Sequence, residues 1–420
     1  MTSKYYFSLI VAALIAGLPL ILPIGAFWVF SLSSLIFLTS IFLKNISVHG
    51  TNVFRVQSND LIRHAPPLII FLLSMLFLLG MYYWGEINTN GLGVVVGLIL
   101  SLFIYYVILK VGLSKNVLFF AFYLCAIIGG NIAFLDYFLI GVSRTGGIYS
   151  AMMFGPIGSL LFVYFFNYLV FHSIKEDQFK WSISVIGFVF SFLMVIASGT
   201  KISVLFLLII LTIEFFYFRA WKHKIFYYGV SVAVLVTILS FDKIRQQPIY
   251  SRMQSGYTTT WQYVFEGRHD IKSSPTVRIE MWRAGWEIFI DNPIFGVGTE
   301  KMYRLVKEVS LKNQFTYSIT HNESHLHNDY VDILVRYGLV GLALFLSLYL
   351  LAFYIFFTNR WMPNFYKACY LSYLVGFLTF GISGATYTYI FGEIFIFGGI
   401  PVLIALVLHN RPKYLEQNYS

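Results

Sequence analysis

Residues 337–357 read YGLVGLALFLSLYLLAFYIFF, a run without a charged side chain. A helix of about 20 apolar residues is long enough to cross the hydrocarbon core of a bilayer. Similar runs recur along the chain, which has 420 residues, is 58% hydrophobic and 11% charged, and has a mean hydropathy of +0.74. The sequence therefore predicts an all-α, polytopic integral membrane protein.

Twelve spans can be placed, and the charges between them predict the orientation of the protein. Basic residues occupy alternate short loops, which by the positive-inside rule puts both termini in the cytoplasm. A cleavable signal peptide fits less well, because the apolar run after Tyr5 continues to Leu43, about twice a typical signal core. The predicted spans are residues 5–22, 24–43, 65–84, 91–110, 115–133, 150–171, 181–198, 201–219, 224–241, 337–357, 365–385 and 389–409.

The long segment at residues 242–336 differs from the rest of the chain in its charge. It holds 12 Lys/Arg and 11 Asp/Glu, so most of the net charge of +10 lies in the short loops and sets orientation instead of binding nucleic acid. We expect residues 1–241 to form a membrane domain of nine spans and residues 337–420 to add three spans and a cytoplasmic tail. Residues 242–336 would form a large helical loop on the face opposite the termini, and a loop of this length is usually functional or disordered.

This loop contains a predicted helix followed by a tight turn. Ser274 and Pro275 suit an N-cap and a first helical position, and Asn292–Pro293 would end the helix. The sequence NPIFGVG at residues 292–298 then predicts the turn. Four residues recur at helical spacing, a pattern suited to packing at the membrane interface: Ile279, Trp282, Trp286 and Phe289.

The densest group of reactive side chains, HNESHLHNDYVDILVR at residues 321–336, directly precedes the opening run. If a helix begins near Asn328, that residue could cap it, with Asp329 in the first turn. If the helix starts earlier, one stripe would hold His325, Asp329, Asp332 and Arg336. His327 would then lie on a different face, with Tyr330, Val331 and Leu334.

Three interpretations of these histidines stay open from the residues alone. They could belong to a polar cap between two helices. A zinc site could use His321 and His325 at i, i+4, completed by His327, Glu323 or Asp329, but the spacing matches no strong zinc signature and we expect no metal. One neutral histidine could act as a general base on a hydroxyl, since its ordinary pKa lies near 6.5.

Several basic residues that are far apart in the sequence could bind an anionic ligand on the membrane face that carries the large loop. Arg278 lies in the predicted loop helix, Arg252 in PIYSRMQ, and Lys201 in ASGTKIS at the start of a span. For Lys201 alone, an interfacial snorkelling residue is the better interpretation. Together, however, these cations are what a lipid-linked diphosphate would require. Arg144, in SRTGGIYSAMMFG, could line the same site or lie in a simple connection.

The ordered set SGTK (198–201), VRIEMWRAGWEIFIDNPIFGVG (277–298) and HLHNDYVDILVRYGLVGL (325–342) resembles the bacterial O-antigen ligase family and its superfamily of ligases and polymerases. With the twelve-span layout and the large loop, the resemblance covers most of the chain. It implies a glycosyltransferase C-type-like membrane fold in the bacterial inner membrane, with the active site at the periplasmic face.

The resemblance also implies a reaction. Members of the family transfer a finished polysaccharide from undecaprenyl diphosphate to the lipid A-core, are thought to invert the anomeric carbon, and need neither metal nor nucleotide. The implied partners are this lipid-linked donor, the lipid A-core acceptor and membrane lipid, with no cofactor. An O-antigen polymerase or a protein O-oligosaccharyltransferase would share the donor. A transporter or flippase is the alternative from another class, for which Glu214 and Glu393 are the acids inside spans.

Residue by residue, the resemblance assigns roles to four positions. His327, before Asn in HLHN, matches the family's base, and Arg278 in VRIEMW matches a diphosphate-binding arginine. Lys201 stands where the family usually has an arginine; lysine keeps the charge but loses the bidentate fork. Arg252 matches a third basic position more loosely. The supporting positions expected around them are His325, Asn328 and Arg144.

Overall fold

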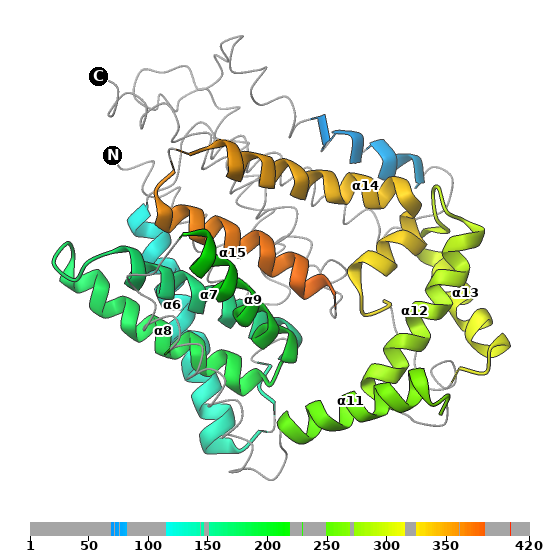
Figure 1. Cartoon of the computed structure of the whole chain (residues 1–420), viewed down its shortest axis with the longest axis horizontal. Helices are drawn as coiled ribbons and strands as arrows, with labels where there is room; N and C mark the ends of the chain where they lie inside the picture. The colour runs from blue at the N-terminus through cyan, green and yellow to red at the C-terminus, as the bar shows by residue number, and fades with distance from the viewer. Residues whose placement is uncertain are drawn as a thin grey trace, which may run out of the picture.

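The computed structural model describes residues 69–70, 72–74, 76–81, 115–142, 144–146, 151–218, 229, 249–268, 273–315, 325–360, 362–382 and 404. Within these ranges every regular element is helical (Figure 1), which confirms the predicted all-α class. Four helices are long and apolar enough to cross a membrane. The predicted spans at 5–22, 24–43, 91–110, 224–241 and 389–409 lie wholly or almost wholly outside the described residues, so the count of twelve and the side of the termini stay predictions.

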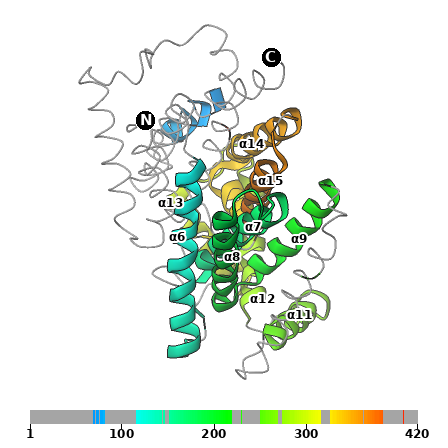
Figure 2. The same cartoon turned by 90° about the vertical axis from the view of Figure 1, so that its left-hand side faces the viewer.

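Six predicted spans are described as helices along most of their length. α7 and α8 pack side by side, α6 lies on α8, and α15 lies against α7 and α9 (Figure 2). Their bounds are α6 Lys115–Phe134, continued by the π-helix η2 Leu135–Ile140, α7 Ala151–Phe171, α8 Gln178–Ser198, α9 Lys201–Tyr217, α14 Asp329–Thr358 and α15 Asn364–Gly381.

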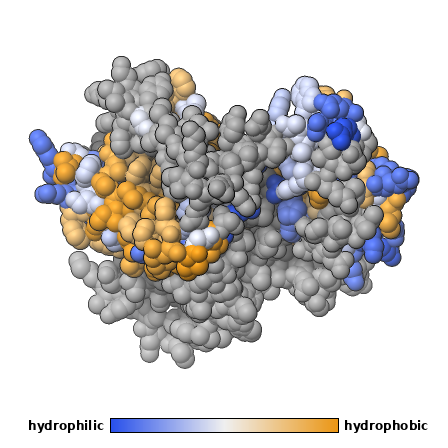
Figure 3. All heavy atoms as spheres, turned by 90° about the horizontal axis from the view of Figure 1, so that it is seen from below, coloured by the Kyte–Doolittle hydropathy of each residue, from blue (hydrophilic) through white to orange (hydrophobic). Residues whose placement is uncertain are grey.

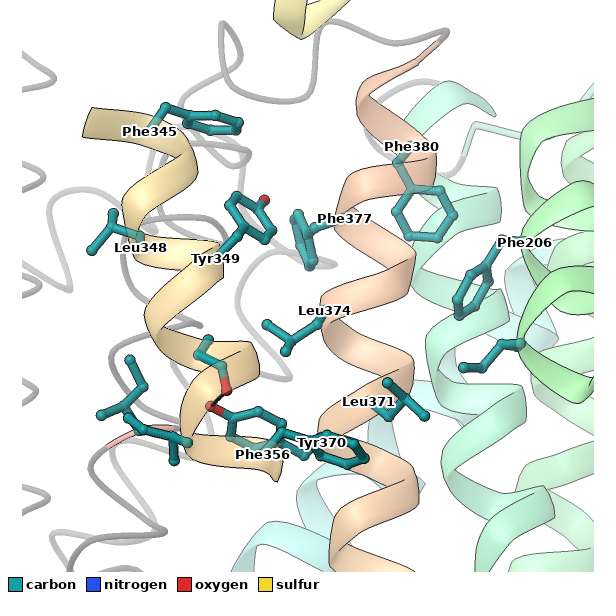
Figure 4. Packing of buried hydrophobic residues seen from close by; sticks show 14 of the residues in the cluster. Phe206, Phe345, Leu348, Tyr349, Phe356, Tyr370, Leu371, Leu374, Phe377 and Phe380 are labelled. Carbon is teal, nitrogen blue, oxygen red and sulfur yellow. Dashed lines mark hydrogen bonds between the residues drawn. The ribbon is translucent and has the colours of Figure 1, made fainter. Parts of the chain in front are cut away.

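α15 lies at the centre of a core that joins α14 to α9 (Figure 4). On one side, Phe380 contacts Phe206 of α9, with ring centroids 5.0 Å apart. On the other side, the Tyr370 hydroxyl donates a hydrogen bond to the Ala352 carbonyl of α14 at 3.0 Å, so its buried polar atom has a partner. This packing fixes the positions of the N-terminal ends of α9 and α14 relative to the C-terminal end of α15.

Glu214 is the acidic side chain that a transporter would require inside a span. It is fully buried in α9, where its Oε1 accepts hydrogen bonds from Asn167 of α7 (3.0 Å) and Ser372 of α15 (2.6 Å). Polar contacts of this kind join helices within membranes. Glu214 therefore has a packing role between three helices, and Glu393 lies outside the described residues.

The predicted loop contains three helices, α11 Ile249–Phe265, α12 Ser274–Asp291 and α13 Gly298–Lys312, which we call the loop helices. The predicted N-cap of α12 is wrong by one residue: Ser273 is the cap, because it forms a reciprocal capping box with Thr276. Pro275 is accordingly the second helical residue. α12 ends at Asp291 before Asn292, as predicted.

The face of α12 that packs inward is formed by Met281, Ala284 and Ile288, which join side chains of α13 and α14 in one apolar cluster. Trp286, from the predicted interfacial stripe, is 55% exposed, and its contact with a membrane stays a prediction. In the view of Figure 3, apolar surface gathers over the long helices and hydrophilic surface over the opposite end, where the loop helices lie.

Candidate functional site

α14 is broken at Gly338, whose φ of 64° and ψ of −163° interrupt the helix at the second residue of the span predicted at 337–357. The exposed backbone of this break is covered by the predicted NPIFGVG turn: Leu339 N–H donates to the Pro293 carbonyl at 2.8 Å. A Cβ at Gly338 would overlap the Ile294 carbonyl, and one at Gly296 would lie 2.5 Å from the Arg336 backbone. The two glycines thus let the loop helices meet α14 backbone to backbone, directly after the histidine cluster.

The HLHN turn, residues 325–328, is held through both backbone groups of Leu326. Its N–H donates to Asp332 Oδ1 of α14 at 2.9 Å, and its carbonyl accepts from the Trp282 indole of α12 at 2.9 Å. The Leu326 side chain packs over Gly285, where a Cβ would lie 2.9 Å from Leu326 Cδ1. The turn is therefore fixed between α12 and α14.

Asn328 caps α14, as predicted. Its Oδ1 accepts from the N–H groups of Tyr330 (3.0 Å) and Val331 (3.1 Å), and its amide donates to the Ile382 carbonyl at the end of α15 (3.1 Å). Because this cap starts the helix at Asp329, the predicted helical stripe through His325 is wrong, and so is the placing of His327 on a helical face. Both histidines lie in the turn.

The two histidines have different environments. His325 is 7% exposed, whereas His327 is more accessible, and their rings are perpendicular with centroids 4.2 Å apart. His327 adopts a positive φ of 51°, a conformation that non-glycine residues rarely take. The structure thus separates a buried histidine from a more exposed one held in a strained backbone.

Asp332 and Arg336 form a buried ion pair one helical turn apart, and the predicted stripe places them correctly relative to each other. They are 1% and 4% exposed, and the Arg336 guanidinium also lies over the Tyr303 ring of α13 at 5.4 Å. Removal of either partner would leave a buried charge without compensation. The pair therefore keeps Asp332 in place, and Asp332 in turn holds the Leu326 N–H.

Lys201 lies at a junction of three helices. It is the first residue of α9 and is exposed, and its Nζ is 3.4 Å from the position that a Cβ would take at Gly256 of α11. Pro275 Cγ, in the first turn of α12, is 3.6 Å from the same position. The Lys201 ammonium group and the first turn of α12 therefore both lie beside Gly256 of α11, and the N-terminal end of a helix favours anions.

Arg144 packs against the SGTK turn that leads to Lys201. Its Nε donates to the Ser198 carbonyl at 3.1 Å, and the next residue, Thr145, donates its N–H to the Ala197 carbonyl at 2.8 Å. Gly199 provides the positive φ of 59° that the turn needs. Arg144 therefore bonds the turn that precedes Lys201, and its part in a binding site stays a prediction.

Arg278 lies in the second turn of α12, between the end that meets Lys201 and the part that holds the HLHN turn. It is partly buried and lies one helical turn before Trp282, so both project from the same side of α12. The neighbouring Glu280 is turned to α11, where it accepts a hydrogen bond from Tyr263 at 3.1 Å. Burial and the Glu280 carboxylate raise the pKa of Tyr263 to about 12.

Some predicted residues are not placed. Arg252 lies in α11, but its side chain is outside the described residues, as are His321 and Glu323 of the zinc interpretation. The residues that are described hold no cluster of three His, Cys, Asp or Glu side chains suited to a metal ion.

The sequence did not predict the contacts of Trp282 and Asp332 with the HLHN turn. A possible signal was that a tryptophan in an apolar cluster needs a partner for its indole N–H.

Comparison with known families agrees with the sequence motifs. Residues 186–346 match the family model described as O-antigen ligase, a range that begins in α8 and includes Lys201, the loop helices, the HLHN turn and the break in α14. No curated protein matches the chain. The apolar helices together with this match indicate a multi-pass membrane protein with a glycosyltransferase-like role. Residues 186–346 are thus similar to the O-antigen ligase family, over the part of the chain that holds the motifs.

Proposed function

We propose that the protein is an O-antigen ligase, which transfers a polysaccharide from undecaprenyl diphosphate to a sugar hydroxyl of the lipid A-core. The observation that carries the proposal is the position of α12, which reaches from the Lys201 junction at one end to the histidine turn at Leu326. This arrangement supports a single site that holds both the cations and the candidate base. Both partners of the reaction are lipids, which fits a site at the ends of membrane helices.

The basic end would bind the diphosphate. Lys201 and Arg278 supply two positive charges, and the N-termini of α9 and α12 add to the positive potential there. Thr200, the N-cap of α9, bonds Ser198 and Ser203 through its hydroxyl and makes no side-chain cap. Arg252 is a third candidate cation. Fixed donors of this kind can stabilise a departing diphosphate.

His327 would act as the general base. Its imidazole takes the proton from the acceptor hydroxyl while the hydroxyl oxygen forms a bond to the anomeric carbon. The bond between that carbon and the diphosphate oxygen breaks, and its electron pair leaves with undecaprenyl diphosphate. Attack opposite to the leaving group inverts the anomeric carbon. His325, buried beside His327, and Asn328, which caps α14, would hold the base in place.

The nearest alternative is an O-antigen polymerase, which uses the same donor and transfers to another undecaprenyl-linked repeat. Deletion of the gene followed by lipopolysaccharide gel electrophoresis separates the two. For a ligase we expect uncapped core and accumulation of lipid-linked polymer, restored by the wild-type chain and not by His327→Ala. A core that carries a single repeat would instead identify a polymerase and contradict the proposal.

A further inference from the structure

Trp282 connects the two chemical parts of the proposed site. It lies one helical turn after Arg278 on α12, at a rise of about 6 Å, and its indole Nε1 donates to the carbonyl of Leu326, the residue before His327. The contact is therefore adjacent to the candidate cation on one side and to the candidate base on the other.

The hydrogen bond fixes the turn through the backbone of Leu326. Leu326 has one N–H and one carbonyl, and these bond to Asp332 and Trp282 respectively. Asp332 belongs to α14, the same helix that the turn leads into, so it fixes the turn only relative to α14. Trp282 belongs to α12, so its hydrogen bond fixes the turn relative to α12 and hence to Arg278.

The packing of Leu326 alone would not set this position as closely. Its side chain lies over Gly285 and Val331 in an apolar cluster, and apolar contacts have little directionality. A hydrogen bond weakens steeply as its angle departs from linearity, so it selects one orientation of the peptide that precedes His327. That peptide also carries the unusual φ of His327.

We propose that Trp282 is a positioning residue, whose indole N–H holds the His327 turn at a fixed place relative to Arg278 on the same helix. The proposal rests on the proposed function, since it concerns the geometry between the diphosphate-binding end and the base. Trp282 itself would touch neither substrate. Its loss should slow the proton transfer and attack, which need both groups in place, more than it weakens binding of the donor.

The test uses Trp282→Phe, which keeps an aromatic ring in the cluster and removes the N–H donor together with part of the indole ring, so stability is measured beside activity. The matched control is Trp286→Phe, one turn further along α12, where the side chain is 55% exposed and contacts Phe289. Purified full-length variants in lipid nanodiscs would be assayed with lipid-linked polysaccharide and lipid A-core isolated from the bacterium that makes the protein. Thermal unfolding of each variant would be recorded in the same nanodiscs.

For Trp282→Phe we expect kcat to fall about tenfold or more, with the KM for the donor changed less than about twofold, whereas Trp286→Phe stays near wild type. Equal kcat values for the two variants would overturn the positioning role. So would a drop in kcat matched by an equal loss of folded protein. His327→Ala is assayed alongside: if it retains transfer, the proposed function fails, and if it is inactive while Trp282→Phe is normal, only the positioning role fails.

Discussion

The two turns that precede α9 and α14 both contain a residue with positive φ, but the type of residue differs between them. The SGTK turn leads into α9 and the HLHN turn leads into α14, and each contains one residue with positive φ. In the first turn that residue is Gly199, at 59°, which adopts the conformation without steric penalty. In the second it is His327, at 51°, where a Cβ makes the same conformation unfavourable by about 1–2 kcal/mol.

The two turns also differ in what surrounds the residue with positive φ. In the SGTK turn, Gly199 lies between the small side chains of Ser198 and Thr200. In the HLHN turn, the residues on either side of the strained histidine are hydrogen-bonded. Leu326 accepts from Trp282 and donates to Asp332, and Asn328 accepts from the Tyr330 N–H. Strained residues that persist because their surroundings over-determine them cluster at functional sites. The conformation of His327 therefore supports its proposed role as a functional residue.

The largest effect is expected from removing the anchor of the strained turn. Asp332→Ala leaves Arg336 buried without its carboxylate and the Leu326 N–H without its acceptor, which should lower the free energy of unfolding by about 3–5 kcal/mol. Thermal or SDS-induced unfolding measures the loss. The double variant Asp332→Leu, Arg336→Leu should recover most of it, and a single variant as stable as wild type would contradict the role of the pair.

The next effect concerns the backbone contact that holds the loop helices on α14. Gly338→Ala places a Cβ on the Ile294 carbonyl at a positive φ, and should destabilise the protein by roughly 2 kcal/mol or more. Gly141→Ala is the matched control, because its φ is also positive, at 85°, but nothing lies within 4 Å. Its loss should be about 1 kcal/mol. Equal unfolding curves for the two variants would show that the close approach contributes nothing.

A smaller effect, on donor binding and not on stability, is expected from Lys201 at the end of the SGTK turn. Lys201→Ala should raise the KM for the lipid-linked donor about tenfold, or about 1.4 kcal/mol, with little change in stability. Lys201→Arg restores the charge with a bidentate fork and should bring the KM back to wild type or below. Lys307→Ala, an exposed lysine on α13, should leave the KM unchanged. A normal KM for Lys201→Ala would remove this residue from the diphosphate site.

The smallest expected change in the free energy of unfolding is a gain in stability. His327→Gly relieves the positive φ and should leave the stability unchanged or raise it by up to about 1 kcal/mol, while it abolishes transfer. Gly199→Ala does the opposite in the other turn and should lower the stability by about 1 kcal/mol. The comparison of the two turns would be wrong if His327→Gly were clearly less stable than wild type.

The sequence predicted local features better than contacts between distant segments. The spans at α6 to α9, the Asn328 cap and the Asp332–Arg336 spacing follow from periodicity and capping rules, which depend on neighbouring residues. The capping box of α12 was misplaced by one residue, since Ser273 and Ser274 are equally suitable by type. The HLHN stripe was wrong because the cap excludes those residues from the helix.

Contacts between residues far apart in the sequence could not be predicted from periodicity or capping rules. Nothing in the periodicity of α12 indicates that Trp282 bonds Leu326, or that Gly338 accommodates the turn after Asp291. The contact between Lys201 and α11 likewise depends on how separate helices pack. The assignment of His327 came from resemblance to a family motif; the structure adds the strained conformation and the bonds that maintain it.

The most direct test of the central claim separates donor binding from transfer in one preparation. His327→Ala, purified in nanodiscs, would be measured for its affinity for the lipid-linked donor and for single-turnover transfer to lipid A-core. We expect donor affinity within about twofold of wild type and transfer slowed at least 100-fold, as for the loss of a general base. Transfer at a near-normal rate by a folded His327→Ala protein would contradict the claim that the HLHN turn carries the base.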